Sequence, residues 1–204
     1  MSLVVEQISA GEMANFSYLV FCSESRKGAA VDPSLAPEKL LERAKQLDVQ
    51  IETIINTHGH YDHIAGNDAV RAASGAKLAA HPADLPDADI ALEDGDCLNI
   101  GRGEISILHT PGHTPGSLTL HLPGALITGD TLFVTRVGRA DLAGSDPRAL
   151  YHSLQRLAAF PDETVVYPGH DYGPQPNSTI GFEKKNNPFL LCKNLESFLE
   201  LRMG

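Results

Sequence analysis

The stretch Thr57-His58-Gly59-His60-Tyr61-Asp62-His63 gathers three imidazoles and a carboxylate within six residues. It follows Val49-Gln50-Ile51-Glu52-Thr53-Ile54-Ile55, whose β-branched residues predict a buried strand. Taken alone, this segment could also be a solvated polar loop. So many ligand-type side chains at the end of a strand favour a functional site instead, because scaffolds commonly present functional groups on the loops that leave their strands.

Imidazole nitrogens and carboxylate oxygens are donors that suit Zn²⁺, Mn²⁺ or Fe²⁺. His58 and His60 are two residues apart, so an extended backbone points both side chains the same way and lets them share one ion. Asp62 and His63 start the following turn and can face a second ion. The spacing therefore predicts a centre for divalent transition-metal ions.

Three more ligand-type residues follow predicted strands, and each lies beside a glycine: His113, Asp130 and His170. A lone Gly-His pair is often only a turn with an exposed imidazole. Three such sites behind the histidine cluster favour ligands, since glycine lets the backbone turn sharply near an ion. With Asp130 as a bridge, each of two ions gains three or four protein ligands. The predicted ligands are His58, His60, Asp62, His63, His113, Asp130 and His170.

The composition of the chain restricts the classes of protein to which it can belong. The chain has 204 residues, 42% of them hydrophobic, which is enough for a sizeable core in one domain. A net charge of −10 argues against a nucleic-acid surface, and no apolar run is long enough to span a bilayer. The N-terminal residues 1–7 lack a secretory signal pattern, and Cys22, Cys97 and Cys192 form no CxxC. We expect a cytoplasmic protein with neither a membrane nor a nucleic-acid partner.

Hydrophobic periodicity predicts strands separated by glycine and proline turns, with helices between them. Strands are expected over residues 3–8, 16–22, 28–31, 49–55, 77–80, 97–100, 104–108, 117–122, 125–127 and 164–167. Helices are expected over 37–47, 65–73 and 147–159, with a last amphipathic helix that begins at Asn187-Pro188. This order predicts two sheets flanked by helices.

The motif set resembles that of the metallo-β-lactamase superfamily from the N-terminal strands to His170. The resemblance implies an α/β fold, an αββα sandwich of two mixed β-sheets flanked by helices. It implies one domain over residues 1–204 with a short C-terminal helical extension over about 174–204. It assigns His58, His60 and His113 to a first metal, Asp62, His63 and His170 to a second, and Asp130 to the bridge. Gly129-Asp130-Thr131-Leu132-Phe133, Val137-Gly138-Arg139 and Tyr167-Pro168-Gly169-His170-Asp171-Tyr172 are most similar to the glyoxalase II (hydroxyacylglutathione hydrolase) and persulfide dioxygenase branch.

That branch implies an enzyme acting on a small-molecule thiol conjugate, such as one derived from glutathione. Two dications (Zn, Fe or Mn) lower the pKa of a shared water from about 15.7 toward 7, and Asp62 can both ligate and orient the nucleophile. A thiolate leaving group, with a pKa near 8.5, needs no general acid. We therefore expect a metal-dependent thioester hydrolase of the glyoxalase II type.

Two other functions stay open. A mononuclear-iron persulfide dioxygenase would hold one Fe(II) with residues matching His58, His113 and Asp130 and leave positions for O₂ and persulfide. A non-catalytic binding module would have no use for an open metal site. Long glyoxalase II enzymes make much of their glutathione contact through a C-terminal helical region, and only 34 residues follow His170 here. The sequence also leaves the oligomeric state open, a homodimer included.

Two further residues are candidates for substrate binding. Arg139 has either a structural ion pair or a substrate anion as its partner. Tyr172 either reaches a bound substrate or packs in the core. The remaining histidines are expected to have structural, turn or surface roles: His81, His109, His121 and His152.

Overall fold

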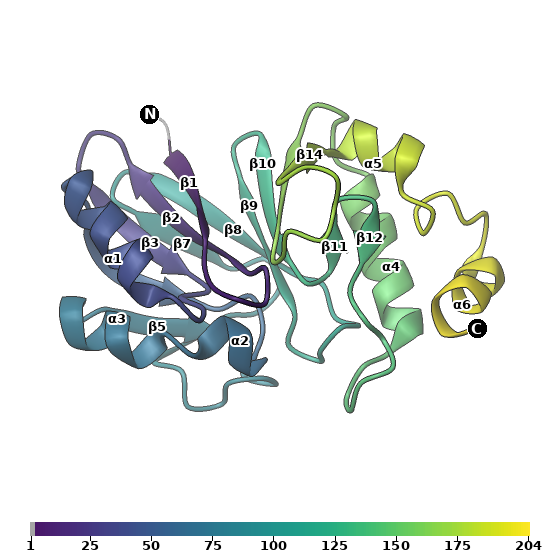
Figure 1. The fold of residues 1–204 in the computed structure, drawn as a ribbon, viewed down its shortest axis with the longest axis horizontal. Coiled ribbons are helices and arrows are strands. Elements are labelled where there is room, and N and C mark those ends of the chain that lie inside the picture. The colour runs from purple at the N-terminus through teal and green to yellow at the C-terminus, as the bar shows by residue number, and fades with distance from the viewer. Residues whose placement is uncertain (1–2) are drawn as a thin grey trace.

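Two six-stranded β-sheets face each other in the computed structural model, which describes residues 3–204 (Figure 1). Met1 and Ser2, which belong to the N-terminal stretch and the expected domain, lie outside the described residues. The first sheet has the order β1-β2-β3-β4-β5-β6. Its strands are β1 (Leu3–Ser9), β2 (Phe16–Cys22), β3 (Lys27–Val31), β4 (Gln50–Ile55), β5 (Lys77–Ala80) and β6 (Ile90–Ala91).

The second sheet has the order β14-β13-β10-β9-β8-β7. Its strands are β7 (Cys97–Ile100), β8 (Gly103–His109), β9 (Leu118–Leu122), β10 (Ala125–Gly129), β13 (Val165–Pro168) and β14 (Ser178–Thr179). A separate antiparallel ribbon pairs β11 (Leu132–Phe133) with β12 (Arg136–Val137). Each sheet mixes parallel and antiparallel pairs, with β3 parallel to β4 and β10 parallel to β13.

Helices cover the outer faces of both sheets (Figure 1). Leu40 and Val70 pack against Leu19 and Ile54 in the cluster that joins α1 and α3 to the first sheet. On the other side, α4 and α6 cover the second sheet through a cluster that includes Leu126 and Phe198. The helices are α1 (Pro37–Gln46), α2 (Tyr61–Ile64), α3 (Asn67–Ser74), α4 (Pro147–Ala158), α5 (Ile180–Asn186) and α6 (Leu195–Met203). The predicted α/β class and the helix-sheet-sheet-helix layering are thus confirmed.

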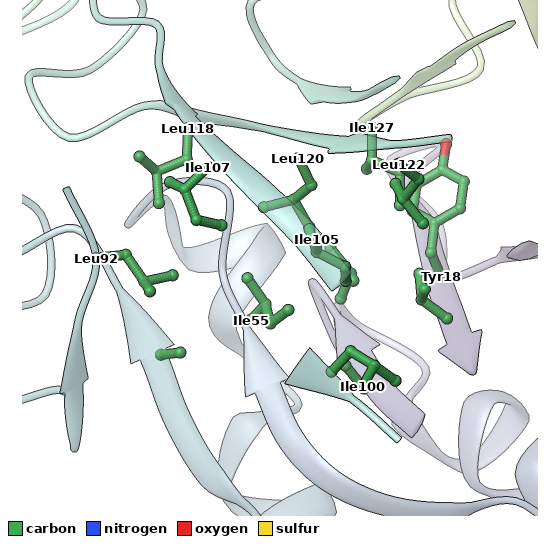
Figure 2. Close-up of a cluster of buried hydrophobic side chains, with 14 of the residues drawn as sticks. Tyr18, Ile55, Leu92, Ile100, Ile105, Ile107, Leu118, Leu120, Leu122 and Ile127 are labelled. Carbon is green, nitrogen blue, oxygen red and sulfur yellow. The ribbon is translucent and has the colours of Figure 1, made fainter. Parts of the chain in front are cut away.

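The main core lies between the sheets. Ile55 and Val20 of the first sheet share one buried cluster with Ile105 and Leu120 of the second. Figure 2 shows Ile55, Ile105 and Leu120 in this cluster, on strands of both sheets, with Tyr18 at one end. Side chains alternate along each strand, so one face of each sheet packs inward while the other packs on helices. Because the apolar side chains along the strands form the core, the loops at the strand ends can carry polar side chains.

The prediction of a last helix beginning at Asn187-Pro188 is wrong. Asn187 instead follows the end of α5, and its buried side chain donates to the carbonyl of Arg136 at 3.0 Å and to Glu183 at 2.9 Å. The last helix begins at Leu195, because Asn194 and Ser197 form a capping box there. Within residues 3–204, no helix combines the length and the apolar character needed to cross a membrane.

Candidate metal centre

The loop that leaves β4 brings two histidines to a third from another loop. His60 has extended backbone angles, and its Nδ1 lies 3.1 Å from Nε2 of His58. Nε2 of His113, from the loop between β8 and β9, lies 2.9 Å from the same Nδ1 of His60. The three nitrogens converge on one point in a geometry that could hold a metal ion. We call these residues the first group: His58, His60 and His113.

A second set of ligand-type side chains comes together from α2 and from the residues just after β13. Nε2 of His63 and Nε2 of His170 lie 3.1 Å apart. Oδ2 of Asp62 lies 3.3 Å from that nitrogen of His170 and 3.6 Å from that of His63. We call Asp62, His63 and His170 the second group, which could also hold an ion.

Asp130, directly after β10, lies between the two groups. Its Oδ2 is 3.5 Å from Nε2 of His113 in the first group and 3.4 Å from Nε2 of His170 in the second. Its Oδ1 is buried and accepts no hydrogen bond of good geometry, although Nε2 of His63 is 3.3 Å away. A Cβ on Gly169 would collide with this oxygen, so only glycine leaves room for the carboxylate. A buried carboxylate oxygen without a donor is what a cation would satisfy.

Hydrogen bonds on the far side of the rings set which nitrogen carries the proton. Nδ1 of His113 donates to the carbonyl of Arg139 at 2.8 Å, and Nδ1 of His170 donates to that of Met13 at 3.0 Å. Carbonyl oxygens only accept, so both Nδ1 atoms bear hydrogen. In each neutral ring, Nε2 therefore has no hydrogen and carries a lone pair that faces the centre. A histidine that binds a metal ion needs such a lone pair.

Asp32 orients two more rings. Its Oδ2 accepts from Nδ1 of His63 at 3.0 Å and from Oγ1 of Thr57 at 2.6 Å. Since the single hydroxyl hydrogen of Thr57 goes to Asp32, its oxygen accepts from Nδ1 of His58, 3.1 Å away. His58 and His63 thus also present Nε2 lone pairs inward. A grouping of Asp32 with His58 and His63 is close enough to ligate, but the two carboxylate oxygens of Asp32 already accept hydrogen bonds from Thr57.

Two Nε2 lone pairs 3.1 Å apart, on His63 and His170, repel unless positive charge lies between them. Burial lowers the pKa of His170, but the nearby carboxylates of Asp130 and Asp62 outweigh it and raise the pKa to about 9. Burial likewise lowers the pKa of His63, and the charge of Asp130 and the bond to Asp32 raise it overall. A proton supplies this charge in the metal-free chain, and a metal cation supplies it when bound. The donor set therefore fits divalent metal ions.

The two carboxylates of the centre stay ionised. Burial raises the pKa of Asp130, but the charge of His63 and the contact with His170 lower it well below its ordinary value overall. The pKa of Asp62 is also lowered, because the contact with His170, the charge of His63 and a hydrogen bond from Asn15 outweigh burial. Neither side chain is therefore a proton donor at neutral pH, and both are suited to hold cations.

A cavity of about 320 Å³ opens directly on this centre. Tyr172 lies on its wall and stacks on His170, with ring centroids 4.5 Å apart and planes within 8°. Arg139 also lines the cavity and forms a two-point ion pair with Asp141, both contacts being 2.9 Å. Arg139 thus makes a structural ion pair, which was one of the two partners expected for it. The cavity residues are His113, Asp130, Phe133, Arg136, Val137, Arg139, Tyr172, Phe189 and Arg202.

The other histidines lie away from the two groups. His81 stacks on His109 with centroids 4.3 Å apart, and its Nδ1 accepts from the backbone N–H of Ala83, a turn role. His121 contacts Phe160 edge to face, and His152 is exposed on α4. These positions agree with the structural and surface roles expected for them.

Sequence reasoning missed the residues that orient the centre. Asp84 joins the two histidine loops: its Oδ2 accepts from the N–H of Gly59 at 2.9 Å and its Oδ1 from the N–H of Gly116 at 2.7 Å. Asn15 donates to Oδ2 of Asp62 at 2.9 Å. The one signal for Asp32 was its place directly after a predicted strand, where a turn or helix start is the commoner explanation.

The chain matches the Metallo-beta-lactamase superfamily over residues 10–89 and 84–170, and it belongs to this family. It is 42% identical over 179 residues to a hydroxyacylglutathione hydrolase of Polaromonas sp. strain JS666, with 83% of this chain and 67% of the relative covered. It is 32% identical to human mitochondrial persulfide dioxygenase ETHE1, with 98% of this chain and 80% of the relative covered. The crystal structure of ETHE1 from Myxococcus xanthus superposes with a TM-score of 0.93 at 32% identity, covering 98% of this chain and 90% of that one.

The chain spans about two thirds of the length of the hydroxyacylglutathione hydrolases that it matches, 67% and 62% of two of them. The matched stretch contains all seven predicted ligands, from His58 to His170. The family resemblance and the metallo-β-lactamase fold expected from the motifs are confirmed.

Proposed function

We propose that this chain hydrolyses the thioester of a glutathione conjugate with two divalent metal ions held by the first and second groups. The observation that carries the proposal is the position of Asp130, whose Oδ2 lies within 3.5 Å of Nε2 of a histidine in each group. Two complete groups with a shared carboxylate suit a pair of ions better than one. The similarity to hydroxyacylglutathione hydrolases supports the substrate class.

When bound, the two ions supply Lewis acidity, which polarises a carbonyl and lowers the pKa of water toward neutrality. The chain itself holds the charges in place. Asp62 is ionised and anchored by Asn15, so it can accept a hydrogen bond from the attacking water and orient it. The phenol of Tyr172 stays protonated, because burial and the charges of Asp130 and Asp62 raise its pKa. We assign Tyr172 and Arg139 to substrate binding.

The centre offers no protonated carboxyl group to a leaving group, since Asp62 and Asp130 both have lowered pKa values. A thiolate, with a pKa of about 8.5, leaves without one. This fits a thioester better than an amide. We further propose one domain with a short C-terminal helical extension, Zn, Fe or Mn as the metals, and a cytoplasmic location.

A persulfide dioxygenase is the second candidate. It is favoured by the similarity to the human enzyme of that name, which extends over 98% of this chain. In that case one Fe(II) would be held by His58, His113 and Asp130, a set of two histidines and one carboxylate that leaves sites open.

The two functions differ in their need for oxygen. The purified metal-loaded protein would be given S-lactoylglutathione and glutathione persulfide separately, in a cell fitted with an oxygen electrode. We expect thiol release from the thioester under strict anaerobiosis. Oxygen uptake stoichiometric with the persulfide, and no release from the thioester, would replace the hydrolase with the dioxygenase.

A further inference from the structure

Glu183 on α5 carries a buried carboxylate that lies outside the metal centre. Its Oε2 accepts from the backbone N–H of Thr135 at 2.9 Å and from Nδ2 of Asn187 at 2.9 Å. Its Oε1 accepts from Oγ of Ser178 at 2.6 Å. Burying a carboxylate costs free energy unless donors replace the lost water, and these donors come from three parts of the chain. Glu183 therefore ties separate segments together.

One of these segments is the turn of the ribbon formed by β11 and β12. Each strand of the ribbon has two residues, and a two-stranded hairpin is at best marginally stable on its own. The loop between the strands consists of Val134 and Thr135, and Thr135 has a φ of 60°. Glycine adopts this left-handed backbone more readily than threonine does. The shape of the turn consequently depends on contacts from outside the ribbon.

Helix α5 and the residue that follows it supply such contacts. Glu183 accepts from the N–H of Thr135 in the middle of the loop. Asn187, which also donates to Glu183, donates to the carbonyl of Arg136 at 3.0 Å, directly after the loop. Both side chains are buried, so water does not compete for these bonds. The turn is thus fixed to the end of α5.

The ribbon carries an aromatic part of the wall of the cavity above the metal centre. Phe133 lines this cavity, and its ring lies edge to face with Tyr172 and His170, with centroids 5.4 and 5.8 Å away. Val134 packs closely on Gly173, where a Cβ would lie 2.5 Å from the Cβ of Val134. A displaced turn would therefore move Phe133 and disturb the segment that carries Tyr172.

We propose that Glu183 is a positioning residue for substrate binding: it holds the turn so that the ring of Phe133 keeps its edge-to-face contact with Tyr172. The inference rests on the proposed function, because it takes this cavity as the substrate site. Glu183 does not line the cavity and acts through the N–H of Thr135. A displacement on the order of 1 Å in a group that contacts the substrate is enough to impair turnover.

Three substitutions of Glu183 test this role. Glu183→Leu leaves the N–H of Thr135 without an acceptor. Glu183→Asp keeps a carboxylate but has a shorter side chain, which draws the acceptor away from the turn. Glu183→Gln can keep every contact, because its amide oxygen accepts from Thr135 and Asn187 while its NH₂ group donates to Ser178. Glu196→Leu is the matched control, since Glu196 is exposed on α6 and makes no side-chain hydrogen bond or ion pair within residues 3–204.

Two properties of the zinc-loaded protein would be measured. Steady-state kinetics with S-lactoylglutathione give kcat and KM, and NMR records the contact between the rings of Phe133 and Tyr172 as a nuclear Overhauser effect. We expect Glu183→Leu to lose the ring contact and to raise KM about 10-fold, with kcat and metal content within about twofold of the wild type. Glu183→Asp should show a smaller change in the same direction. Glu183→Gln and Glu196→Leu should match the wild type.

An unchanged ring contact, or a KM within about twofold of the wild type, in folded Glu183→Leu would overturn the proposal. If Glu183→Leu does not fold, Glu183→Asp is judged by the same two results. Unfolding of all three variants would show a role in folding alone and would also overturn it.

Failure of the proposed function has a different signature. The wild-type protein would then release no thiol from S-lactoylglutathione. The ring contact between Phe133 and Tyr172 is recorded without substrate, so its loss or retention in the Glu183 variants still decides whether Glu183 positions the cavity wall.

Discussion

Asp32 accepts a hydrogen bond from Nδ1 of His63 at 3.0 Å, and both side chains are buried. This contact fixes the ring so that Nε2 faces the second group. Asp32→Asn keeps the shape but turns either an amide N–H or a weaker acceptor toward the ring. We expect metal affinity to fall about 10- to 100-fold, as is typical when a partner that orients a ligand is lost.

Competition with a chromophoric chelator would measure the affinity of Asp32→Asn. Glu24→Gln is the control, because Glu24 makes an exposed ion pair with Arg102 away from the centre. Affinity within twofold of the wild type in Asp32→Asn would show that Asp32 does not orient His63.

We predict that removing the carboxylate of Asp84 lowers the stability of the fold even when no metal is bound. Its carboxylate accepts from the N–H groups of Gly59 and Gly116 and from the hydroxyl of Thr114, at 2.9, 2.7 and 2.6 Å. Asp84→Ala leaves these donors without their acceptor, which should lower the free energy of unfolding by about 1–3 kcal/mol. Denaturant unfolding of the metal-free protein measures the change.

Asp87→Ala serves as its control, since Asp87 lies in the same loop, is exposed and makes no side-chain hydrogen bond or ion pair within residues 3–204. Equal stability of the two variants would contradict the role given to Asp84.

The ligand assignment predicts that His58→Ala and Asp130→Ala each abolish turnover while the chain still folds. Both side chains are on loops at strand ends, so the main core between the sheets does not contain them. Circular dichroism would confirm folding, and bound metal would add stability by mass action. His152→Ala, an exposed position on α4, is the control. More than a tenth of wild-type activity in either ligand variant would be incompatible with the assignment.

Much of the fold and of the centre could be predicted from local sequence. Strands such as Phe16–Cys22 match their predicted bounds because an apolar run between turns defines them without tertiary information. The seven residues predicted as ligands could be picked out because several imidazoles and carboxylates directly after strands are an unusual combination in one chain. The structure brings all seven predicted ligands together, from His58 on the first sheet to His170 on the second.

The rest depends on contacts between distant segments. Asn187 looks like a helix start beside a proline, yet tertiary bonds to Arg136 and Glu183 bury it at the end of α5. Asp84 connects loops 25 and 32 residues away, which local spacing does not reveal. Arg202 enters the cavity only because α6 folds back against Gly138, 64 residues earlier.

The number of metal ions per chain tests the central claim most directly. Elemental analysis of the protein as purified, without added metal, would count the transition-metal ions. With complete first and second groups sharing Asp130, we predict close to two ions per chain and loss of activity when a chelator removes them. One iron ion per chain and no other metal would contradict the two-metal hydrolase and support the dioxygenase.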